Sequence, residues 1–275
     1  MRIQKEFEDL QKYIDKLSFQ QEKKIVKNYA VVLKDLRSIL SDVYSRYSNS
    51  NGILSYSEMS KYNRLKVFER EIISILSGIT RDNAKIVKAG LKNVYKESFD
   101  ITKDAIQSKI NKTIRGVIKD DILELSLQNP ISGLTLNKRL ERNRAGIITT
   151  INEQITQGLV KGESYRQMSD RIKGRLEGDA TKAVRIVRTE SHRVMEDGKY
   201  DSLNYASNQG VDMEKTWLTA GDEAVRSKHK SMNDKSVKFD QDFILPDGAR
   251  GQRPGSIGVA EHDINCRCIF IIDIK

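Results

Sequence analysis

Two cysteines and a nearby histidine are the residues of this sequence with the clearest capacity for chemistry. Cys266 and Cys268 are the only cysteines among 275 residues, and they follow His262 in the stretch EHDINCRC (261–268). Thiolate and imidazole groups bind metal ions, neighbouring thiols can undergo redox chemistry, and free cysteine is also a common small residue of buried strands. The sequence therefore leaves three interpretations open: a metal centre, a redox pair, or two small side chains in a terminal strand. Because two cysteines one residue apart cannot form a disulfide framework, we expect a reducing compartment.

The chemically distinctive side chains gather in the last third of the chain. All three histidines, both cysteines and the single tryptophan lie between residues 190 and 268. After Gly210 the helical periodicity stops, and glycine, proline and turn signals appear. The short apolar runs KTWLT (215–219) and CIFIIDI (268–274) are typical of strands. The sequence therefore predicts a small α+β domain that begins near residues 180–185.

Long helices with one narrow apolar stripe precede that domain. In the first helix, apolar residues recur at spacings of three and four, which places them on one face. The stripe comprises Phe7, Leu10, Ile14, Leu17, Ile25, Tyr29, Val32, Leu36, Ile39, Val43 and Tyr47. Such helices pack against each other within one chain or against other copies. The predicted fold class is mainly α with a small α+β C-terminal domain and an extended helical N-terminal scaffold.

Turn residues predict where the helices end. SNSNG (48–52) ends the first helix, and SGITRDN (77–83) is a weaker break. A third helical run is expected from about residue 84 to 127, before a proline. Further along, EGDA separates a short helix near residues 164–176 from a longer one over about 181–208.

The charge of the chain is unevenly distributed. Its net charge is +10, yet residues 185–275 hold 14 Lys and Arg against 15 Asp and Glu, whereas residues 1–184 hold 34 against 23. The densest basic stretch, residues 135–188, has 12 basic and 6 acidic side chains. Such an excess favours polyanionic partners, although a solvated helical face explains any single patch equally well. The candidate DNA contacts are Lys138, Arg139, Arg142, Arg144, Lys161, Arg166, Arg171, Lys173 and Arg175.

Membrane and secretion signals are not recognisable in the sequence. It has no run of about 18 apolar residues, so no membrane span is predicted. The N-terminus, MRIQKEFEDL, lacks the apolar core of a signal peptide. We therefore expect a protein that starts in a cytoplasm and does not integrate into a membrane.

Six short motifs follow one another in an order known from one protein family. GLTLNKRLERN, GLVKGESYRQMSDRI and AVRIVRTESHR precede WLTAGDEAVRSKH, LPDGARGQRPGS and EHDINCRC. Together they resemble the phage head morphogenesis domain of minor capsid proteins, which the F protein of phage Mu shares with the minor head proteins of Bacillus phage SPP1 and similar tailed phages. The resemblance covers about residues 130–272. Each motif is weak alone, whereas the ordered set is specific.

The resemblance implies a minor head protein of the virion. Proteins of this family lie inside the capsid near the portal, associate with portal, capsid or scaffold proteins during procapsid assembly in the host cytoplasm, and in some cases bind double-stranded DNA without sequence preference. They are not generally enzymes. We expect a long-helix region for portal and assembly contacts (1–130), a basic helical segment (131–184) and a compact α+β head-morphogenesis domain (185–275).

The motifs also contain residues expected to have structural roles. We expect the NCRC turn to hold the terminal strand against the helix that carries RTESHR. The structural residues are Arg188, Glu190, Arg193, Trp217, Asp222, Arg226 and Asn265.

The same resemblance bears on the cysteines. Many family members carry a Cys-x-x-Cys pair before the final Cys-Arg-Cys, and these four thiols look like a metal site. Here Arg226 and His229 stand where that pair would fall. Arginine keeps its proton and cannot bind a metal, whereas zinc accepts imidazole. One hypothesis is therefore a zinc site of His229, His262, Cys266 and Cys268. The alternatives are two small buried cysteines, and a hydrogen-bond network that has replaced the metal.

Two rival functions have less support in the sequence. His229, His262, Asp222 and Glu190 would form the hydrolytic site of a metal-dependent nuclease or a toxin-like enzyme if folding brought them together. However, the sequence has no His-Asn-His core, no paired carboxylates of recognisable spacing and no glycine loop for a nucleotide. A regulatory DNA-binding protein would need a recognition motif, and none is recognisable. Any DNA binding should therefore be nonspecific.

Overall fold

The computed structural model describes residues 1–118, 120–131 and 133–275, which form two compact units. Unit 1 comprises residues 1–21, 87–137 and 185–275. Unit 2 comprises residues 22–86 and 138–184. Both units are discontinuous in sequence, unlike the three consecutive segments expected from the sequence. The predicted fold class, mainly α with a small α+β part, is confirmed.

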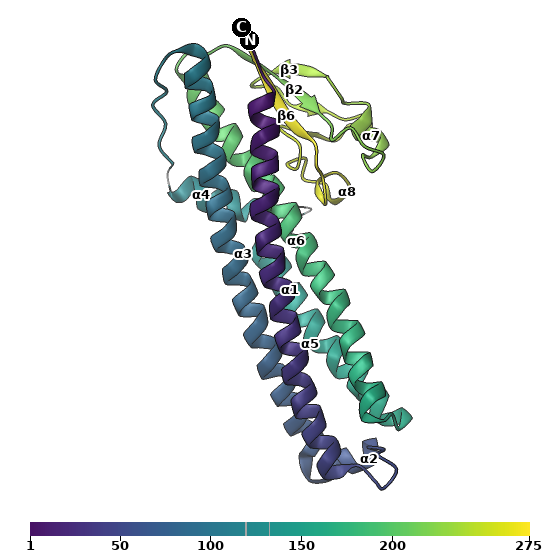
Figure 1. Ribbon diagram of the computed structural model, residues 1–275. Helices are drawn as coiled ribbons and strands as arrows, with labels where there is room; N and C mark the ends of the chain where they lie inside the picture. Colours follow the sequence, from purple (N-terminus) through teal and green to yellow (C-terminus); the bar gives the residue numbers. More distant parts are fainter. Residues whose placement is uncertain (119, 132) are drawn as a thin grey trace. The chain divides into compact units, whose positions relative to one another are not determined.

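Four long helices dominate the secondary structure. They are α1 (Lys5–Tyr47), α3 (Arg64–Ile110), α5 (Leu136–Lys161) and α6 (Tyr165–Asn208) (Figure 1). The shorter helices are α2 (Tyr56–Ser60), η1 (Lys61–Asn63), α4 (Asp120–Gln128), α7 (Ser227–Lys230) and α8 (Ala260–Asp263). Within the described ranges, no helix is both long enough and apolar enough to cross a membrane.

Two of the predicted helix breaks are wrong. α3 continues through SGITRDN, and α6 continues through EGDA. Neither stretch contains proline, and Gly78 and Gly178 face open space, so each costs its helix only about 1 kcal/mol. The helical run predicted to reach residue 127 instead ends at Ile110, because Asn111 adopts a φ of 48°. A residue in this left-handed conformation commonly terminates a helix.

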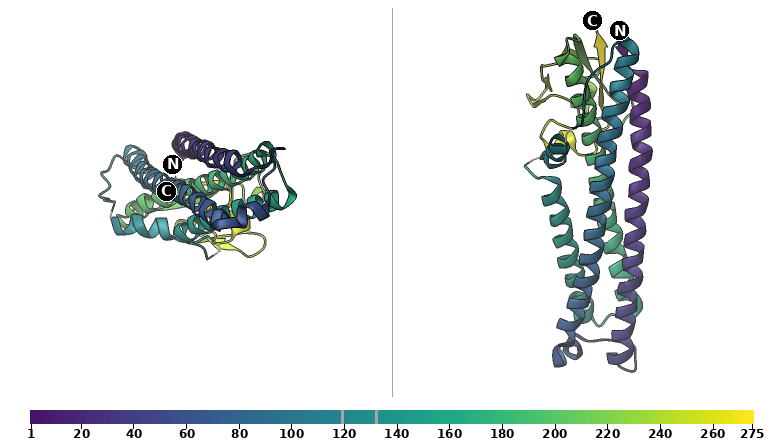
Figure 2. Two further views of the ribbon diagram at one scale, coloured as in Figure 1. Left: turned by 90° about the horizontal axis from the view of Figure 1, so that it is seen from below. Right: turned by 90° about the vertical axis from the view of Figure 1, so that its left-hand side faces the viewer.

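Unit 2 contains segments of α1, α3, α5 and α6 that lie side by side, together with α2 and η1 (Figures 1 and 2). The apolar stripe of α1 supplies much of the core, as expected for a bundle within one chain. Towards its C-terminus, however, α1 buries Leu36, Leu40 and Tyr44, whereas the predicted stripe residues Ile39 and Val43 are only half-buried. A stripe of near-heptad spacing drifts around a straight helix by about 20° per heptad, so its last residues turn away from the core.

Unit 1 contains the β-structure. An antiparallel sheet has the strand order β1-β6-β2-β3, and β4 pairs with β5 separately. The strands are β1 (Arg2–Ile3), β2 (Met213–Leu218), β3 (Ser236–Lys238), β4 (Phe243–Ile244), β5 (Arg250–Gly251) and β6 (Ile269–Ile274). The two predicted strands are confirmed as β2 and β6, which are neighbours over their whole length. The pairing of β1 with β6 was not predicted, because two residues are too short to carry a pattern.

Candidate metal centre and nucleic-acid interface

Three potential metal ligands meet in the interior of unit 1. His229 lies on α7, and Cys266 and Cys268 lie just before β6. The Nδ1 atom of His229 is 3.7 Å from the Sγ atom of Cys266 and 3.5 Å from that of Cys268. All three ligand atoms lie within 4.8 Å of one another, and each side chain is at most 3% exposed. One imidazole and two thiolates are ligands of tetrahedral zinc, which requires one more.

His192 on α6 is a further candidate for that fourth ligand, although it lies outside the group whose ligand atoms are all within 4.8 Å of one another, and the sequence prediction did not include it. Its ring is 5% exposed, and neither ring nitrogen has a hydrogen bond of good geometry to a residue that the structure describes. Although burial opposes protonation, the nearby Cys266 thiol raises the pKa of His192 above its usual value. A buried imidazole beside a thiol can serve as a metal ligand in its neutral form, so a metal would have to displace the proton that the thiol favours. Its only signal in the sequence was its place in RTESHR.

His262, which the sequence placed among the ligands, lies behind His229 instead. Its Nδ1 atom is 3.2 Å from Nε2 of His229, and its Nε2 atom is 3.0 Å from Oδ2 of Asp247. If Nδ1 of His229 holds a metal, its Nε2–H can donate to His262, whose own Nε2–H then donates to Asp247. Metal-binding histidines are commonly oriented by such outer partners. In that arrangement His262 would orient His229 and would not itself bind the metal.

The two thiols share one hydrogen-bonded environment. A hydrogen bond to Cys268, together with burial, raises the pKa of Cys266 to about 11. The same bond lowers the pKa of Cys268. Zinc binds thiolates, so a metal would have to displace both thiol protons. The donor set and its burial fit a structural zinc site.

Several of the predicted structural residues anchor the turn before β6. The backbone N–H of Asn265 donates to Oγ1 of Thr189 on α6 at 3.1 Å. The side chain of Arg226 donates to the carbonyl of Ile264. Trp217 is fully buried. Its ring lies edge-on to the imidazole of His229, and the centres of the two rings are 5.3 Å apart. These contacts agree with the hypothesis that the turn is held against the RTESHR helix.

Buried ion pairs surround Arg193 on the same helix. Its guanidinium contacts Glu190 at 2.9 Å and Asp197 at 2.8 Å, and it donates to the carbonyl of Ser126 at 2.7 Å. Arg253 reaches the other oxygen of Asp197, with Nε at 2.9 Å. Asp197 is buried, which opposes its ionisation, but the two arginines hold its pKa below the usual value. Arg188, in contrast, is exposed.

The four residues of the predicted hydrolytic site have different partners. The carboxylate of Asp222 accepts two hydrogen bonds from Arg267 on the surface, at 2.5 and 2.7 Å. Glu190 is buried against Arg193. The imidazoles of His229 and His262 stack on each other. The only group of candidate metal ligands within the described part of the chain contains neither carboxylate.

All nine candidate DNA contacts lie in unit 2, which carries nearly all the net charge. Unit 2 has 22 Lys and Arg against 13 Asp and Glu, a net charge of +9, whereas unit 1 has 26 against 25, or +1. Some of the nine have acidic partners, as in the pairs Arg144–Glu141 and Arg171–Glu163. The candidates classed as exposed are Lys138, Arg142, Lys161, Arg166 and Lys173.

Comparison with known proteins agrees with the sequence motifs. The family described as Phage Mu protein F like protein matches residues 149–271. The minor head protein GP7 of Bacillus phage SPP1 is 34% identical over 274 residues, which cover 97% of this chain and 87% of that protein.

A second relative is longer. The NAD(+)--arginine ADP-ribosyltransferase EFV of Enterococcus faecalis is 28% identical over 239 residues, which cover 86% of this chain but only 49% of that enzyme. This chain thus spans about half of the enzyme's length. No solved structure matches. The similarity to GP7 over almost the whole chain, together with the family match, shows that the chain belongs to the Mu F-like family of phage minor head proteins.

Proposed function

We propose that this minor head protein binds double-stranded DNA without sequence preference through unit 2 and associates with the portal during head assembly. The observation that supports the DNA-binding part is the separation of charge: +9 in unit 2 against +1 in unit 1. A surface of scattered Lys and Arg neutralises phosphates and releases counterions without reading bases. Packaged DNA inside a head is a concentrated source of such phosphates. Membership of the family, which the resemblance links to the portal, supports the proposed portal association.

We also propose a structural role for the metal centre. His229, Cys266, Cys268 and His192 would hold zinc, which would link α7, α6 and the segment before β6. A closed four-ligand site stabilises a fold and leaves no position for a substrate. This role suits a head protein better than catalysis does.

A gel-shift titration with unrelated DNA duplexes tests the DNA proposal. The wild-type protein is compared with a variant in which Lys138, Arg142, Lys161 and Arg166 are changed to Glu. We expect the wild type to bind all sequences and to lose affinity with salt, and the variant to bind at least about 10-fold more weakly at 0.15 M salt. Four exposed lysines of unit 1 changed to Glu, at positions 96, 112, 230 and 235, form the control.

The outcome distinguishes the candidate functions. Equal losses in the two variants would show that DNA binding does not depend on unit 2. The titration is repeated with magnesium, zinc or chelator. Metal-dependent loss of full-length DNA would support the nuclease alternative and direct attention to His229 and His262. DNA that stays intact under all conditions agrees with a structural head protein.

Elemental analysis of the native protein tests the metal proposal. We expect close to one zinc ion per chain, and less than about a tenth would overturn the proposal. The variant His192→Ala should retain less zinc than His262→Ala, because only the first removes a ligand. If His262→Ala instead retains less zinc than His192→Ala, the fourth ligand is His262, as expected from the sequence.

A further inference from the structure

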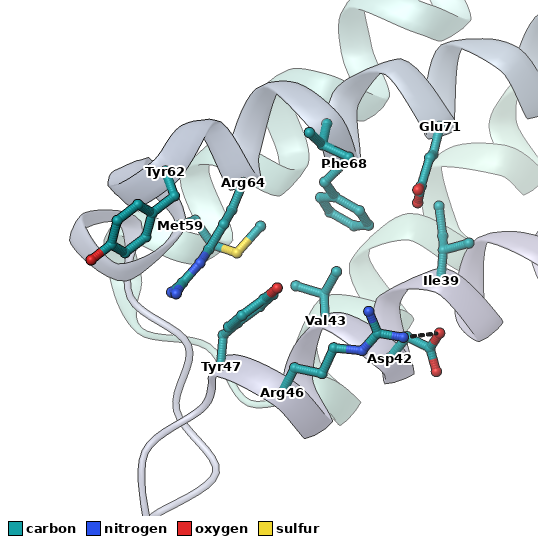
Figure 3. A pocket seen from close by; sticks show the side chains of 11 residues that line it. Ile39, Asp42, Val43, Arg46, Tyr47, Met59, Tyr62, Arg64, Phe68 and Glu71 are labelled. Atoms are coloured by element: carbon teal, nitrogen blue, oxygen red, sulfur yellow. Dashed lines mark hydrogen bonds and ion pairs between the residues drawn. The ribbon is translucent and has the colours of Figure 1, made fainter.

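A groove of about 440 Å³ lies in unit 2 between the end of α1 and the start of α3, and most of the side chains that line it are apolar (Figure 3). Of its charged side chains, Asp42 is paired with Arg46, and Arg64 is paired with Glu58. Because these charges have partners within the protein, they do not indicate the chemistry of a ligand.

The loop LPDGARGQRPGS (245–256) in unit 1 has little regular secondary structure, yet side-chain contacts fix its position. Arg253 donates to Asp197 on α6, with its Nε atom at 2.9 Å. The side chain of Gln252 accepts a hydrogen bond of 2.7 Å from Lys215 on β2. The loop is therefore held against α6 and β2, the elements that surround the candidate metal centre.

Near the start of this loop, Asp247 ends a chain of hydrogen bonds that begins at the metal centre. Its Oδ2 atom is 3.0 Å from Nε2 of His262, whose Nδ1 atom is 3.2 Å from Nε2 of His229. Asp247 also contacts Nζ of Lys228 at 2.9 Å and accepts from the backbone N–H of Ala249 at 3.2 Å. These contacts hold the pKa of the Asp247 carboxyl well below its usual range, so the ionised group only accepts hydrogen bonds.

The carboxylate of Asp247 determines which nitrogen of each histidine carries the proton. A neutral imidazole has one donor and one acceptor nitrogen, so His262 donates from Nε2 to Asp247 and accepts at Nδ1. His229 then donates from Nε2, which leaves its Nδ1 atom unprotonated. That atom lies 3.7 Å from Sγ of Cys266 and 3.5 Å from Sγ of Cys268, where a shared metal would need a lone pair.

At the other end of the loop, Gly255 packs against His192, the further candidate ligand. A Cβ atom on Gly255 would lie 3.0 Å from Cδ2 and 3.4 Å from Nε2 of the His192 ring. Just after this contact, the carboxylate of Asp263 accepts the backbone N–H groups of Ile257 and Gly258 at 3.0 and 2.7 Å. The absence of a side chain at Gly255 therefore lets a fixed backbone close over the imidazole.

We propose that this loop clasps the metal centre and positions its ligands from outside. Asp247 orients His229 through His262. Gly255 seats the ring of His192. The role of the loop rests on the metal centre proposed above. Outer contacts of this kind raise metal affinity, because they hold the ligands in the orientation that binds the metal.

Metal titration of the full-length protein tests the contact of Asp247. Zinc and cobalt(II) are each titrated in competition with a chromophoric chelator. The variant Asp247→Ala removes the carboxylate that orients His262, whereas the control Glu261→Ala removes a neighbouring carboxylate that pairs with the same Lys228. We expect the first to weaken metal binding about 10- to 100-fold and the control by less than about 3-fold. Adding Asp247→Ala to His262→Ala should cause no further loss, because Asp247 acts through His262.

Two glycine variants form the matched pair for the second contact. Gly255→Ala and Gly258→Ala both place alanine at a positive φ, of 76° and 83°. Only the first brings a Cβ atom against His192, since no described atom lies within 4 Å of a Cβ on Gly258. We expect Gly255→Ala to bind metal at least about 10-fold more weakly than Gly258→Ala and to change the absorption spectrum of bound cobalt(II). Circular dichroism checks that both variants are folded.

Nitrogen NMR of the three imidazoles tests the hydrogen-bond chain independently of metal affinity. In the wild type we expect His229 and His262 to carry their protons on Nε2. The variant Asp247→Ala should allow His262 to carry its proton on Nδ1 instead. A wild-type His229 that carries its proton on Nδ1 would overturn the chain.

The titrations distinguish failure of the clasp from failure of the metal centre. A wild type that binds neither zinc nor cobalt(II) would overturn both. If the wild type binds metal, equal affinities of Asp247→Ala and Glu261→Ala would overturn the contact of Asp247. Equal affinities of the two glycine variants would overturn the seat of His192. A further loss on adding Asp247→Ala to His262→Ala would show that Asp247 does not act through His262. The last three results reject the clasp and leave the metal centre intact.

Discussion

α6 contributes residues to both units, and two groups of its charged side chains have opposite environments. In unit 1, Arg193, Asp197 and Lys199 are at most 2% exposed, and each has a charged partner. In unit 2, Lys173 and Glu177 form a pair 3.8 Å apart and are 48% and 67% exposed. The same helix therefore supplies a buried ionic network in one unit and a solvated surface in the other.

The difference shows that charge composition alone does not assign a role to a basic helix. A buried charge loses its hydration, so it must be paired within the protein and is not available to a ligand. An exposed charged side chain keeps its hydration, and it can form an ion pair with a phosphate at little cost in free energy. Unit 1 is nearly neutral and buries a network of paired charges on α6, whereas unit 2 carries an excess of positive charge, part of it on exposed side chains.

The largest effect expected from this comparison is the loss of Arg193. The variant Arg193→Ala removes a buried guanidinium that contacts both Glu190 and Asp197 and should lower the free energy of unfolding by about 3–5 kcal/mol. The control Lys173→Ala in unit 2 should change it by less than about 0.5 kcal/mol. Urea unfolding followed by circular dichroism measures both. Similar changes in the free energy of unfolding for the two variants would contradict the distinction between buried charges in unit 1 and exposed charges in unit 2.

Replacing either of two glycines on α6 by alanine should change the stability of the protein by an intermediate amount. A Cβ atom on Gly198 would lie 2.5 Å from the carbonyl oxygen of Tyr95, whereas nothing lies within 4 Å of one on Gly174. We expect Gly198→Ala to destabilise the protein by about 1–3 kcal/mol, because α3 must move away. Gly174→Ala should instead stabilise it by up to about 1 kcal/mol, because alanine favours a helix. Thermal unfolding measures the two changes, and a stabilising Gly198→Ala would disprove the close packing in unit 1.

The smallest effect expected is a dependence of stability on pH. Burial, with Arg253 nearby, lowers the pKa of Lys215 to about 8, below the value of an unfolded lysine. Above pH 8 the unfolded chain therefore binds more protons at this residue than the folded chain, and the free energy of unfolding rises with pH. Between pH 8 and 9 the rise should be about 1 kcal/mol, and below pH 8 it should level off.

The variant Lys215→Met isolates this contribution. It should flatten the rise between pH 8 and 9 in urea unfolding, since the methionine side chain carries no titrating group. If the wild type and the variant have parallel stability profiles, Lys215 is hydrated in solution. In that case the buried charges of unit 1 are less isolated from water than the comparison requires.

The sequence was informative where a local pattern has a single structural consequence. The strands at KTWLT and CIFIIDI, the first long helix and the ordered motifs of the family were all identified from short-range pattern. Helix ends at 77–83 and 177–180 were predicted wrongly, because polar residues and glycine weaken a helix only slightly when neighbouring helices pack against it.

Only part of the candidate metal centre could be predicted from the sequence. Cys266, Cys268 and His229 could be proposed from residue type and family resemblance. Their meeting with His192, and the place of His262 behind His229, depend on how α6, α7 and α8 pack in unit 1. Contacts between residues more than 30 positions apart leave no periodic trace in one sequence.

The sequence by itself determined the mainly helical class, the two central strands, the total charge of +10 and the supply of two thiols and three imidazoles. Only the tertiary structure decided how these were used. Packing divided the chain into interleaved units, placed +9 of the charge in one of them, and selected which apolar residues of α1 were buried. The physical reason is that burial and ion pairing are properties of neighbours in space, whereas composition and periodicity are properties of neighbours along the chain.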